Sequence, residues 1–300
     1  PSYNTNDLLG ENADETWSAL QEQKGTPLLN HATQETLPPG SIFKIITTAA
    51  GLNNGFNPGS SLTGANSIVL PDSVTELTNY GNQMCGGSQS VTLQTAFALS
   101  CNTAFVEMSE SIGADELRKY AEAFGVGEKY DLGVNSAAGN LGELADGAQV
   151  AQSAIGQRDV TMSALQAAIM AGTVANKGKR MEPYLINRIT DAQMNEIRAT
   201  KPRQAEQAVT EDVANTIKEL MYGSEHSTFG YDGNSFASKT GTAEHGDGLA
   251  PHVWYVAFDP DRDIAVAVVV KDGGNLGESA TGGQVSAPIG RAILRAYGGQ

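Results

Sequence analysis

The sequence predicts an α+β protein in which helices come first and antiparallel strands come last. Two observations support this prediction. Helical patterns recur through the first two thirds of the chain, and three apolar, strand-like runs follow one another in the last third, before a closing helix at 283–297. No change in composition marks a linker, so residues 1–300 are expected to form one folded unit.

The expected helices are recognised by signals at their ends as well as by apolar spacing. A helix at 41–52 follows Pro-Pro-Gly and ends before Asn-Asn-Gly. Thr161 is placed to cap a helix that ends near Asn176, and Thr210 to cap one at 211–222 with acidic residues in its first turn. Further helical patterns occupy 15–23, 91–99, 103–109 and 114–124.

Three strands are predicted at 235–242, 253–258 and 264–270. Asp-Pro-Asp at 259–261 supplies the turn between the last two strands. Residues 56–90 are rich in Gly, Asn, Pro and Ser, so they are expected to form loops.

Composition excludes some classes of function. A net charge of −15 and a pI near 4.6 argue against nucleic-acid binding, because phosphates would be repelled. No apolar run reaches the roughly 18 residues that a membrane-spanning helix needs. Neither Cys-x-x-Cys nor His-Glu-x-x-His occurs and the four histidines are scattered, so neither a metal nor a cofactor is expected.

The two cysteines, Cys85 and Cys101, leave two interpretations open. They could be buried free thiols, as in cytosolic proteins. They could equally form one disulfide that closes a short loop in an exported protein.

A hydroxyl and an amine lie one helical turn apart at Ser41 and Lys44. At this spacing the two side chains share one helix face, and Ser41 falls at the helix N-terminus, where its backbone N–H is a free donor. A serine, a lysine base and an N–H that can bind an oxyanion are sufficient for acyl transfer. Alone, the pattern also fits a surface serine and lysine on an amphipathic helix.

Two further motifs lie downstream. Ser-Cys-Asn at 100–102 leaves a helix end with a hydroxyl and an amide two residues apart, where a capping serine is the alternative interpretation. Lys-Thr-Gly-Thr at 239–242 places an amine and two hydroxyls on a strand, with a glycine that lets a ligand backbone lie close to the strand edge. Solvent-facing polar residues at a strand end are the alternative there.

The three motifs, in this order, are those of penicillin-binding proteins and serine β-lactamases. The surrounding sequence resembles the transpeptidase domain of class B penicillin-binding proteins, in particular of the penicillin-binding protein A type, over nearly the whole chain. The similar segments are Pro-Ser-Tyr-Asn at 1–4, Leu-Pro-Pro-Gly-Ser at 37–41, Ile-Gly-Gln at 155–157 and Trp-Tyr-Val-Ala-Phe at 254–258. The resemblance implies that residues 1–300 are a transpeptidase domain, with an antiparallel sheet flanked by helices and an all-helical lobe.

The resemblance also implies roles for single residues. Ser41 would be the nucleophile and Lys44 its general base. Ser100 would relay a proton to the leaving amine, and Asn102 would bond Lys44 and the substrate amide. A lysine base must be neutral, although its reference pKa is about 10.4. Burial and a second nearby positive charge would lower that pKa in the required direction.

The third motif would bind the substrate. Lys239 would supply positive potential, and Thr240 and Thr242 would hold the terminal carboxylate, beside Gly241. The backbone N–H groups of Ser41 and Thr242 would form the oxyanion hole.

The implied activity is that of a D,D-transpeptidase, which cross-links peptidoglycan stem peptides ending in D-Ala-D-Ala through a Ser41 acyl-enzyme and is inhibited by β-lactams. Implied partners are a glycosyltransferase and proteins of cell-wall elongation or division, outside the cytoplasmic membrane. An exported enzyme favours the disulfide over free thiols.

In this family a membrane anchor, a pedestal domain and the first sheet strands precede the lead-in at 1–4, and we expect the chain to lack them. The sheet should then contain only the three late strands unless another polypeptide supplies partners. Without partners, 264–270 would be a long apolar edge.

Other functions remain open. In a serine β-lactamase or a D,D-carboxypeptidase, water rather than an amine would resolve the same acyl-enzyme, although no carboxylate has the sequence context of a deacylating base. A non-enzymatic β-lactam sensor or a wall-assembly scaffold is a further alternative. The presence of Ser41, Lys44, Ser100 and Lys239 argues against a catalytically silent scaffold.

Overall fold

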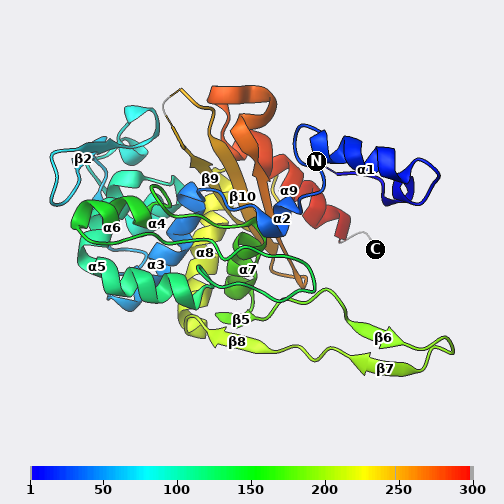
Figure 1. Cartoon of the computed structure of the whole chain (residues 1–300). Coiled ribbons are helices and arrows are strands. Elements are labelled where there is room, and N and C mark those ends of the chain that lie inside the picture. The colour runs from blue at the N-terminus through cyan, green and yellow to red at the C-terminus, as the bar shows by residue number, and fades with distance from the viewer. Residues whose placement is uncertain (1, 247, 298–300) are drawn as a thin grey trace.

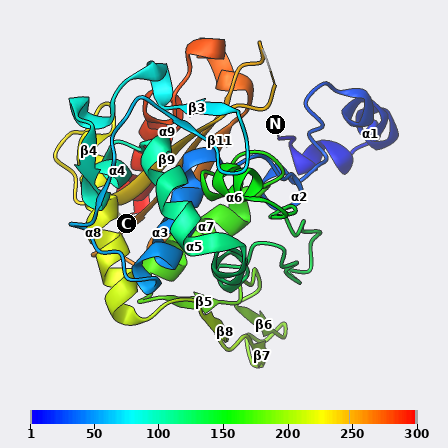
Figure 2. The ribbon, with the colours of Figure 1, turned by 90° about the vertical axis from the view of Figure 1, so that its left-hand side faces the viewer.

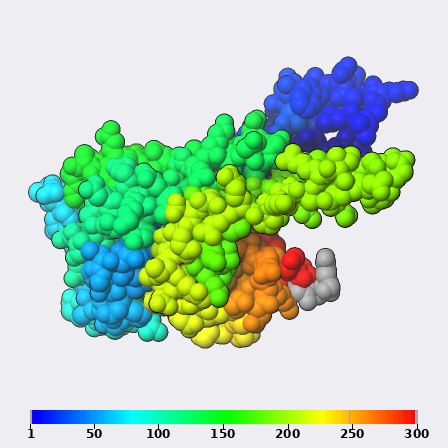
Figure 3. Space-filling model, turned by 90° about the horizontal axis from the view of Figure 1, so that it is seen from below, coloured from blue at the N-terminus to red at the C-terminus, as the bar shows by residue number. Residues whose placement is uncertain are grey.

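The computed structural model describes residues 2–246 and 248–297. It has the predicted α+β architecture, with a central sheet between helices and a lobe of helices beside it (Figure 1). Two slender segments project from this body (Figure 3). One is the N-terminal stretch with α1 (Ala13–Glu22), and the other is the hairpin of β6 (Arg188–Thr190) and β7 (Glu196–Ala199).

The central sheet is antiparallel and has the strand order β11-β10-β9. The three strands are β9 (Ala237–Ala243), β10 (His252–Asp259) and β11 (Ile264–Val270). All three strand predictions are confirmed, with shifts of one or two residues at some ends. β9 and β11 are the two edges, so one side of β9 is available to other parts of the molecule.

Helices cover both faces of the sheet. On one face α9 (Gly282–Tyr297) packs against β10 and β11, and on the other lie α7 (Ala164–Ala175) and α8 (Glu211–Ser227). Alternate side chains of β10 therefore enter two different cores. Tyr255 and Ala257 join the α9 side, and Trp254, Val256 and Phe258 join the main core. A strand buried on both faces explains the unbroken apolar run in the sequence.

The helical lobe consists of α3 (Lys44–Asn53), α4 (Leu93–Ala98), α5 (Asn102–Ala123) and α6 (Gly147–Ala154), with α5 packed between α3 and α6 (Figure 2). The first eight residues of α3 are all buried. This helix is surrounded on every side, so the alternative of a surface serine and lysine does not apply to it.

Short elements connect these helices and strands. They are η1 (Thr5–Leu8), α2 (His31–Gln34), η2 (Gly40–Phe43), β1 (Ser61–Thr63), β2 (Ser67–Val69), β3 (Glu76–Thr78), η3 (Tyr80–Asn82), η4 (Cys85–Gly87), β4 (Ser90–Thr92), β5 (Lys179–Met181), β8 (Gln204–Gln207) and η5 (Lys271–Ser279). The two hairpins β5–β8 and β6–β7 were not predicted from the sequence, because their strands are only three or four residues long.

Several helix starts differ from the sequence prediction. The helix expected at 41–52 opens with the 3₁₀ turn η2, which holds Ser41, and its α-helical part α3 begins only at Lys44. Ser163, and not Thr161, caps α7, because Ser163 and Gln166 form a reciprocal capping box. Thr161 instead forms a bridge with Asn140. The helix expected at 91–99 begins only at Leu93, because the preceding residues pair as β4 with β1.

Two helix interiors also differ. The patterns at 103–109 and 114–124 belong to one element, α5, which is interrupted at Gly113 by a left-handed φ of 74°. The Thr210 cap is confirmed, but α8 continues five residues past the predicted end at 222, to Ser227.

A buried charge network lies behind β9. The carboxylate of Glu225 accepts hydrogen bonds from Arg291 Nε at 2.7 Å, the Tyr255 hydroxyl at 3.0 Å and the Ser238 hydroxyl. Glu225 is fully buried and Arg291 is 3% exposed. The network joins α8, α9, β9 and β10, and Ser238 precedes Lys239 on β9.

We expect Glu225→Gln to lower the free energy of unfolding by about 3–5 kcal/mol, because it leaves the Arg291 guanidinium buried without its counter-charge. Urea unfolding monitored by circular dichroism measures the change. Glu219→Gln, the same substitution at an exposed position of α8, serves as the control. Equal effects of the two substitutions would contradict this prediction.

Candidate active site

The three sequence motifs meet at one cleft of about 720 Å³ between the helical lobe and the edge of β9. Ser41 comes from η2, Ser100 from the junction of α4 and α5, and Thr242 from β9, and all three line the cleft. The structure therefore brings together motifs that are far apart in the sequence. Asn102 and Thr240 line the same cleft.

Lys44 lies beneath this cleft and is fully buried. Its Nζ lies 3.0 Å from Ser41 Oγ, and it donates to Asn102 Oδ1 at 2.8 Å and to the Ser100 carbonyl at 2.8 Å. These two acceptors take both N–H groups of a neutral amine, which leaves its lone pair for the Ser41 hydroxyl. The amine lies 5.3 Å from the centre of the Phe105 ring. The predicted pairing of the first and second motifs is therefore present as direct hydrogen bonds.

Lys239 is the second fully buried amine. Its Nζ donates to Ser100 Oγ at 2.9 Å and to the Thr240 carbonyl at 3.1 Å. Ser100 Oγ is also 3.4 Å from Lys44 Nζ, so this one hydroxyl lies between the two amines. Every hydrogen-bond partner that the described residues offer to these amines is a neutral oxygen.

Burial without a carboxylate partner disfavours the charged form of both lysines. Burial, and secondly the nearby charge of Lys239, hold the pKa of Lys44 well below its usual value. Burial alone lowers the pKa of Lys239 to about 7. The site thus places next to Ser41 an amine whose neutral form is favoured by burial and by a neighbouring charge, beside a second amine whose pKa is about 7.

Backbone turns place the two serines. Ser100 has a left-handed φ of 60°, which ends α4 and turns the hydroxyl towards the lysines. Gly40, before the first serine, has a φ of 53°, and its N–H donates to the Gly156 carbonyl at 2.9 Å. Trp254 Nε1 donates to the Pro38 carbonyl at 2.8 Å, so β10 also holds the approach to Ser41.

Gly241 lies close to the turn that carries Ser41. A Cβ at this position would lie 2.7 Å from the Pro39 carbonyl oxygen and 3.2 Å from the Ile42 side chain. The side of Gly241 on which a Cβ would lie is therefore filled by Pro39 and the protein's own η2 turn. The glycine allows the edge of β9 to approach the turn that carries Ser41.

Comparison with known proteins agrees with this arrangement. A family model described as the penicillin binding protein transpeptidase domain matches residues 1–295. The chain belongs to this family.

Similar relatives and structures are known within the penicillin-binding protein family. The chain is 45% identical to the peptidoglycan D,D-transpeptidase PbpA of Mycolicibacterium smegmatis and 42% identical to PbpA of Mycobacterium tuberculosis. Each alignment covers 99% of this chain but only 62% of the relative. The penicillin G acyl-enzyme complex of penicillin-binding protein A from M. tuberculosis superposes with a TM-score of 0.93 at 42% identity, over 99% of this chain and 70% of that one. The expected fold is confirmed.

The disulfide interpretation is also confirmed in this penicillin-binding protein domain. Cys85 and Cys101 are bonded, with their Cα atoms 5.8 Å apart. The bond joins η4 to the residue that follows Ser100. It therefore restricts the loop that presents the second motif.

Several residues that line the cleft were not identified from the sequence. They are Tyr80, Gln157, Phe229, Thr281 and Gly282. None of these residues belongs to the three motifs, and their positions in the sequence do not indicate that they lie at one cleft. The one available signal was the Gly282-Gly283 pair, whose small residues let α9 begin close to the Gly241 carbonyl.

The low pKa of Lys239 predicts a pH dependence of stability. The unfolded chain keeps this amine protonated up to about pH 10.4, whereas the folded chain releases the proton near pH 7. The unfolded state therefore binds more protons between these values, and stability should rise with pH, by at most about 1.4 kcal/mol per pH unit for this group.

We expect urea unfolding at pH 7, 8 and 9 to show a smaller rise in stability for Lys239→Met than for the unsubstituted protein. Lys201→Met, which removes an exposed lysine, should leave the rise unchanged. Parallel pH curves for all three proteins would disprove the assignment of this dependence to Lys239.

Proposed function

We propose that this chain is the catalytic domain of a D,D-transpeptidase that cross-links peptidoglycan stem peptides ending in D-Ala-D-Ala and is inhibited by β-lactams. The observation that carries the proposal is the 3.0 Å hydrogen bond between Ser41 Oγ and the buried amine of Lys44, in an open cleft. The printed names of the relatives, peptidoglycan D,D-transpeptidase PbpA, support the same activity.

In the proposed acylation, neutral Lys44 accepts the proton of Ser41 as Oγ attacks the carbonyl carbon of the penultimate D-Ala. The oxyanion is held by the backbone N–H groups of Ser41 and Thr242. Ser100, between the two amines, passes a proton to the leaving D-Ala nitrogen. The Ser41–Lys44 and Ser100–Lys239 contacts, at 3.0 and 2.9 Å, lie within the roughly 3.2 Å that proton transfer needs, and the 3.4 Å between Ser100 Oγ and Lys44 Nζ must shorten when substrate binds.

The terminal carboxylate of the stem peptide is proposed to bind at β9. Thr240 and Thr242 line the cleft, and the buried amine of Lys239 donates to Ser100 Oγ and to the Thr240 carbonyl. A protonated Lys239 supplies positive potential to an anion in a site of low dielectric constant. The side-chain oxygen of Asn102 accepts a hydrogen bond from Lys44, and its side-chain nitrogen donates one to the Thr78 carbonyl at 3.1 Å. These two bonds hold the Asn102 side chain where we propose that it contacts the substrate amide.

The fate of the acyl-enzyme distinguishes a transpeptidase from a β-lactamase or a D,D-carboxypeptidase. The acidic residues that line the cleft are Glu76 and Glu244. Glu76 accepts a hydrogen bond from the Ser67 hydroxyl. Among the described residues, no hydrogen bond joins Glu76 or Glu244 to the catalytic candidates Ser41, Lys44 and Ser100. This supports slow attack by water and resolution by an acceptor amine.

Incubation with penicillin G, followed by intact mass spectrometry over hours, tests this proposal. We expect one stable penicilloyl adduct, absent from Ser41→Ala, and formation at least about 100-fold slower in Lys44→Met, because the general base is lost. An adduct that disappears within seconds would favour a β-lactamase. An adduct on Ser41→Ala would remove Ser41 as the nucleophile.

A stem-peptide substrate with a labelled acceptor amine separates the remaining alternatives. Transfer to the amine supports the transpeptidase, and release of D-Ala by water alone supports a carboxypeptidase. A stable penicillin adduct without turnover of either kind would support a β-lactam sensor or a scaffold.

We also propose a cellular location and partners for the enzyme. A penicillin-binding domain with a disulfide fits a location outside the cytoplasmic membrane, where disulfides persist. None of the helices among the described residues is long and apolar enough to cross a bilayer. A membrane anchor, a glycosyltransferase partner and proteins of cell-wall elongation or division remain proposals that rest on the family.

We further propose that residues 1–300 act as one transpeptidase domain and that the free edge of β11 pairs with strands from elsewhere. Within residues 2–246 and 248–297, β11 pairs only with β10, and its sequence is apolar throughout. The chain spans 62% of the length of the curated relatives, which leaves room for such strands.

Amide hydrogen exchange tests the pairing of β11. We expect the outward-facing N–H groups of 264–270 to exchange rapidly in this chain and slowly in a version extended by the strands that the family implies, because pairing protects amides. Rapid exchange in both would contradict the proposal.

A further inference from the structure

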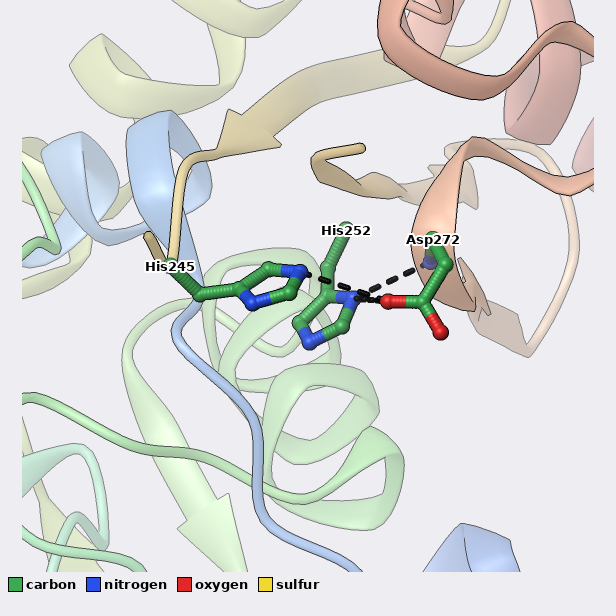
Figure 4. Close-up of side chains that lie close together, drawn as sticks. All are labelled: His245, His252 and Asp272. Atoms are coloured by element: carbon green, nitrogen blue, oxygen red, sulfur yellow. Dashed lines mark hydrogen bonds and ion pairs between the residues drawn. The ribbon is translucent and has the colours of Figure 1, made fainter. Parts of the chain in front are cut away.

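Two histidines and an aspartate meet beyond the end of β9 that carries Thr242 (Figure 4). His245 lies in the connection from β9 to β10, His252 is the first residue of β10, and Asp272 lies near the start of η5. One ligand atom from each of the three side chains lies within 4.8 Å of the other two. The mechanism proposed above uses none of these residues.

The separations match those of metal ligands. His245 Nε2 lies 3.3 Å and His252 Nδ1 lies 3.5 Å from Asp272 Oδ1. In a tetrahedral zinc site with bonds of about 2.0–2.2 Å, adjacent ligand atoms are about 3.3–3.6 Å apart. An ion between Asp272 Oδ1 and either ring nitrogen would therefore have ordinary bond lengths, and contact with both nitrogens requires the rings to turn toward it.

The surroundings of the three residues also suit an ion. The His252 side chain is 7% exposed and that of His245 is 20% exposed, whereas Asp272 is 64% exposed. The two rings are stacked, with centroids 3.9 Å apart and planes 18° apart, so at least one ring must rotate for both lone pairs to converge on one ion. The exposed carboxylate leaves a route from solvent, and a fourth coordination position can be taken by water.

The present hydrogen bonds of the two histidines differ in how they relate to this use. The Asp272 backbone N–H donates to His252 Nδ1 at 3.2 Å, which requires the lone pair of that nitrogen, the same form that binds a metal. His245 Nε2 lies 2.9 Å from the Ala250 carbonyl oxygen, which can only accept, so this nitrogen carries its proton and would release it to bind an ion. A bound ion would replace both hydrogen bonds with coordinate bonds.

We propose that His245, His252 and Asp272 form a binding site for a divalent transition-metal ion, with Zn²⁺ as the preferred ion. Two imidazoles and one carboxylate are the ligand set of several zinc sites, and they suit the hard ions Mg²⁺ and Ca²⁺ poorly. The ion would tie the connection between β9 and β10 to η5. Glu244, next to His245, lines the cleft, so the bound ion would also hold that part of the cleft wall.

No metal site was predicted from the sequence, because His245, His252 and Asp272 do not follow the sequence spacing of a known metal-binding motif. Asp272 and His252 are twenty residues apart, and they approach only because β10 and β11 pair as a hairpin. The competing explanation is a hydrogen-bonded cluster that stabilises the loops without an ion. It predicts no stoichiometric binding of metal.

Zinc titration of the chain without a histidine tag tests the site. The protein is first stripped with a chelator, and Zn²⁺ binding is then measured in competition with a chromophoric chelator. We expect one ion per chain, with a Kd in the micromolar range or below. Co²⁺ in place of Zn²⁺ should give the intense visible absorption bands of a tetrahedral site.

Two ligand variants and one matched control make the result specific. His245→Gln and Asp272→Asn should each raise the Kd by at least about tenfold and weaken the cobalt bands. His226→Gln removes a histidine that packs on Tyr231 in another part of the molecule and should change neither. All variants should unfold at the same temperature without metal and should still be acylated by penicillin, which shows that they are folded.

Absence of stoichiometric Zn²⁺ binding would overturn the proposal, as would binding that survives in both ligand variants. These outcomes are independent of the catalytic proposal, because the titration involves no Ser41 chemistry. Zinc binding without penicillin acylation would contradict the proposed function and leave the metal site supported.

Discussion

The burial of two lysine amines around the hydroxyl of Ser100 is the constraint on which the rest of this structure depends. Neither Lys44 nor Lys239 is exposed, and their partners are neutral oxygens. Such burial costs folding free energy and lowers both pKa values. The same cost makes the site chemically useful, since it favours the neutral form of the amine beside Ser41. The fold must therefore supply stability elsewhere.

That stability comes from the surroundings of the two lysines. α3 is buried from Lys44 to Gly51 within the helical lobe, and β10 is buried on both faces. Behind β9, the Glu225–Arg291 pair joins two helices and two strands next to Lys239. The disulfide restrains the loop before Ser100. These features together limit the movement of the three segments that meet at the cleft.

The same edge of β9 connects the catalytic cleft with the proposed metal site. Gly241 lets the strand lie against the η2 turn, and the strand then continues through Thr242 towards His245. Catalytic and metal-binding candidates therefore share one rigid strand, which is bonded along its length to β10. An ion held by the loops at its end would act on the cleft through this strand and through Glu244.

The sequence by itself determined the elements whose signals are local or repeated: the three late strands, the Thr210 cap and the three motifs with their order. It also indicated the chemistry of Ser41, Lys44, Ser100 and Lys239, because nucleophile, base and cation have characteristic side chains. Only the tertiary structure decided which neighbour fills the space beside Gly241, that Ser163 rather than Thr161 caps α7, and that His245, His252 and Asp272 meet. The reason is physical: caps, clashes and ligand sets depend on distances between segments, and those distances arise only when the sheet and the helical lobe pack together.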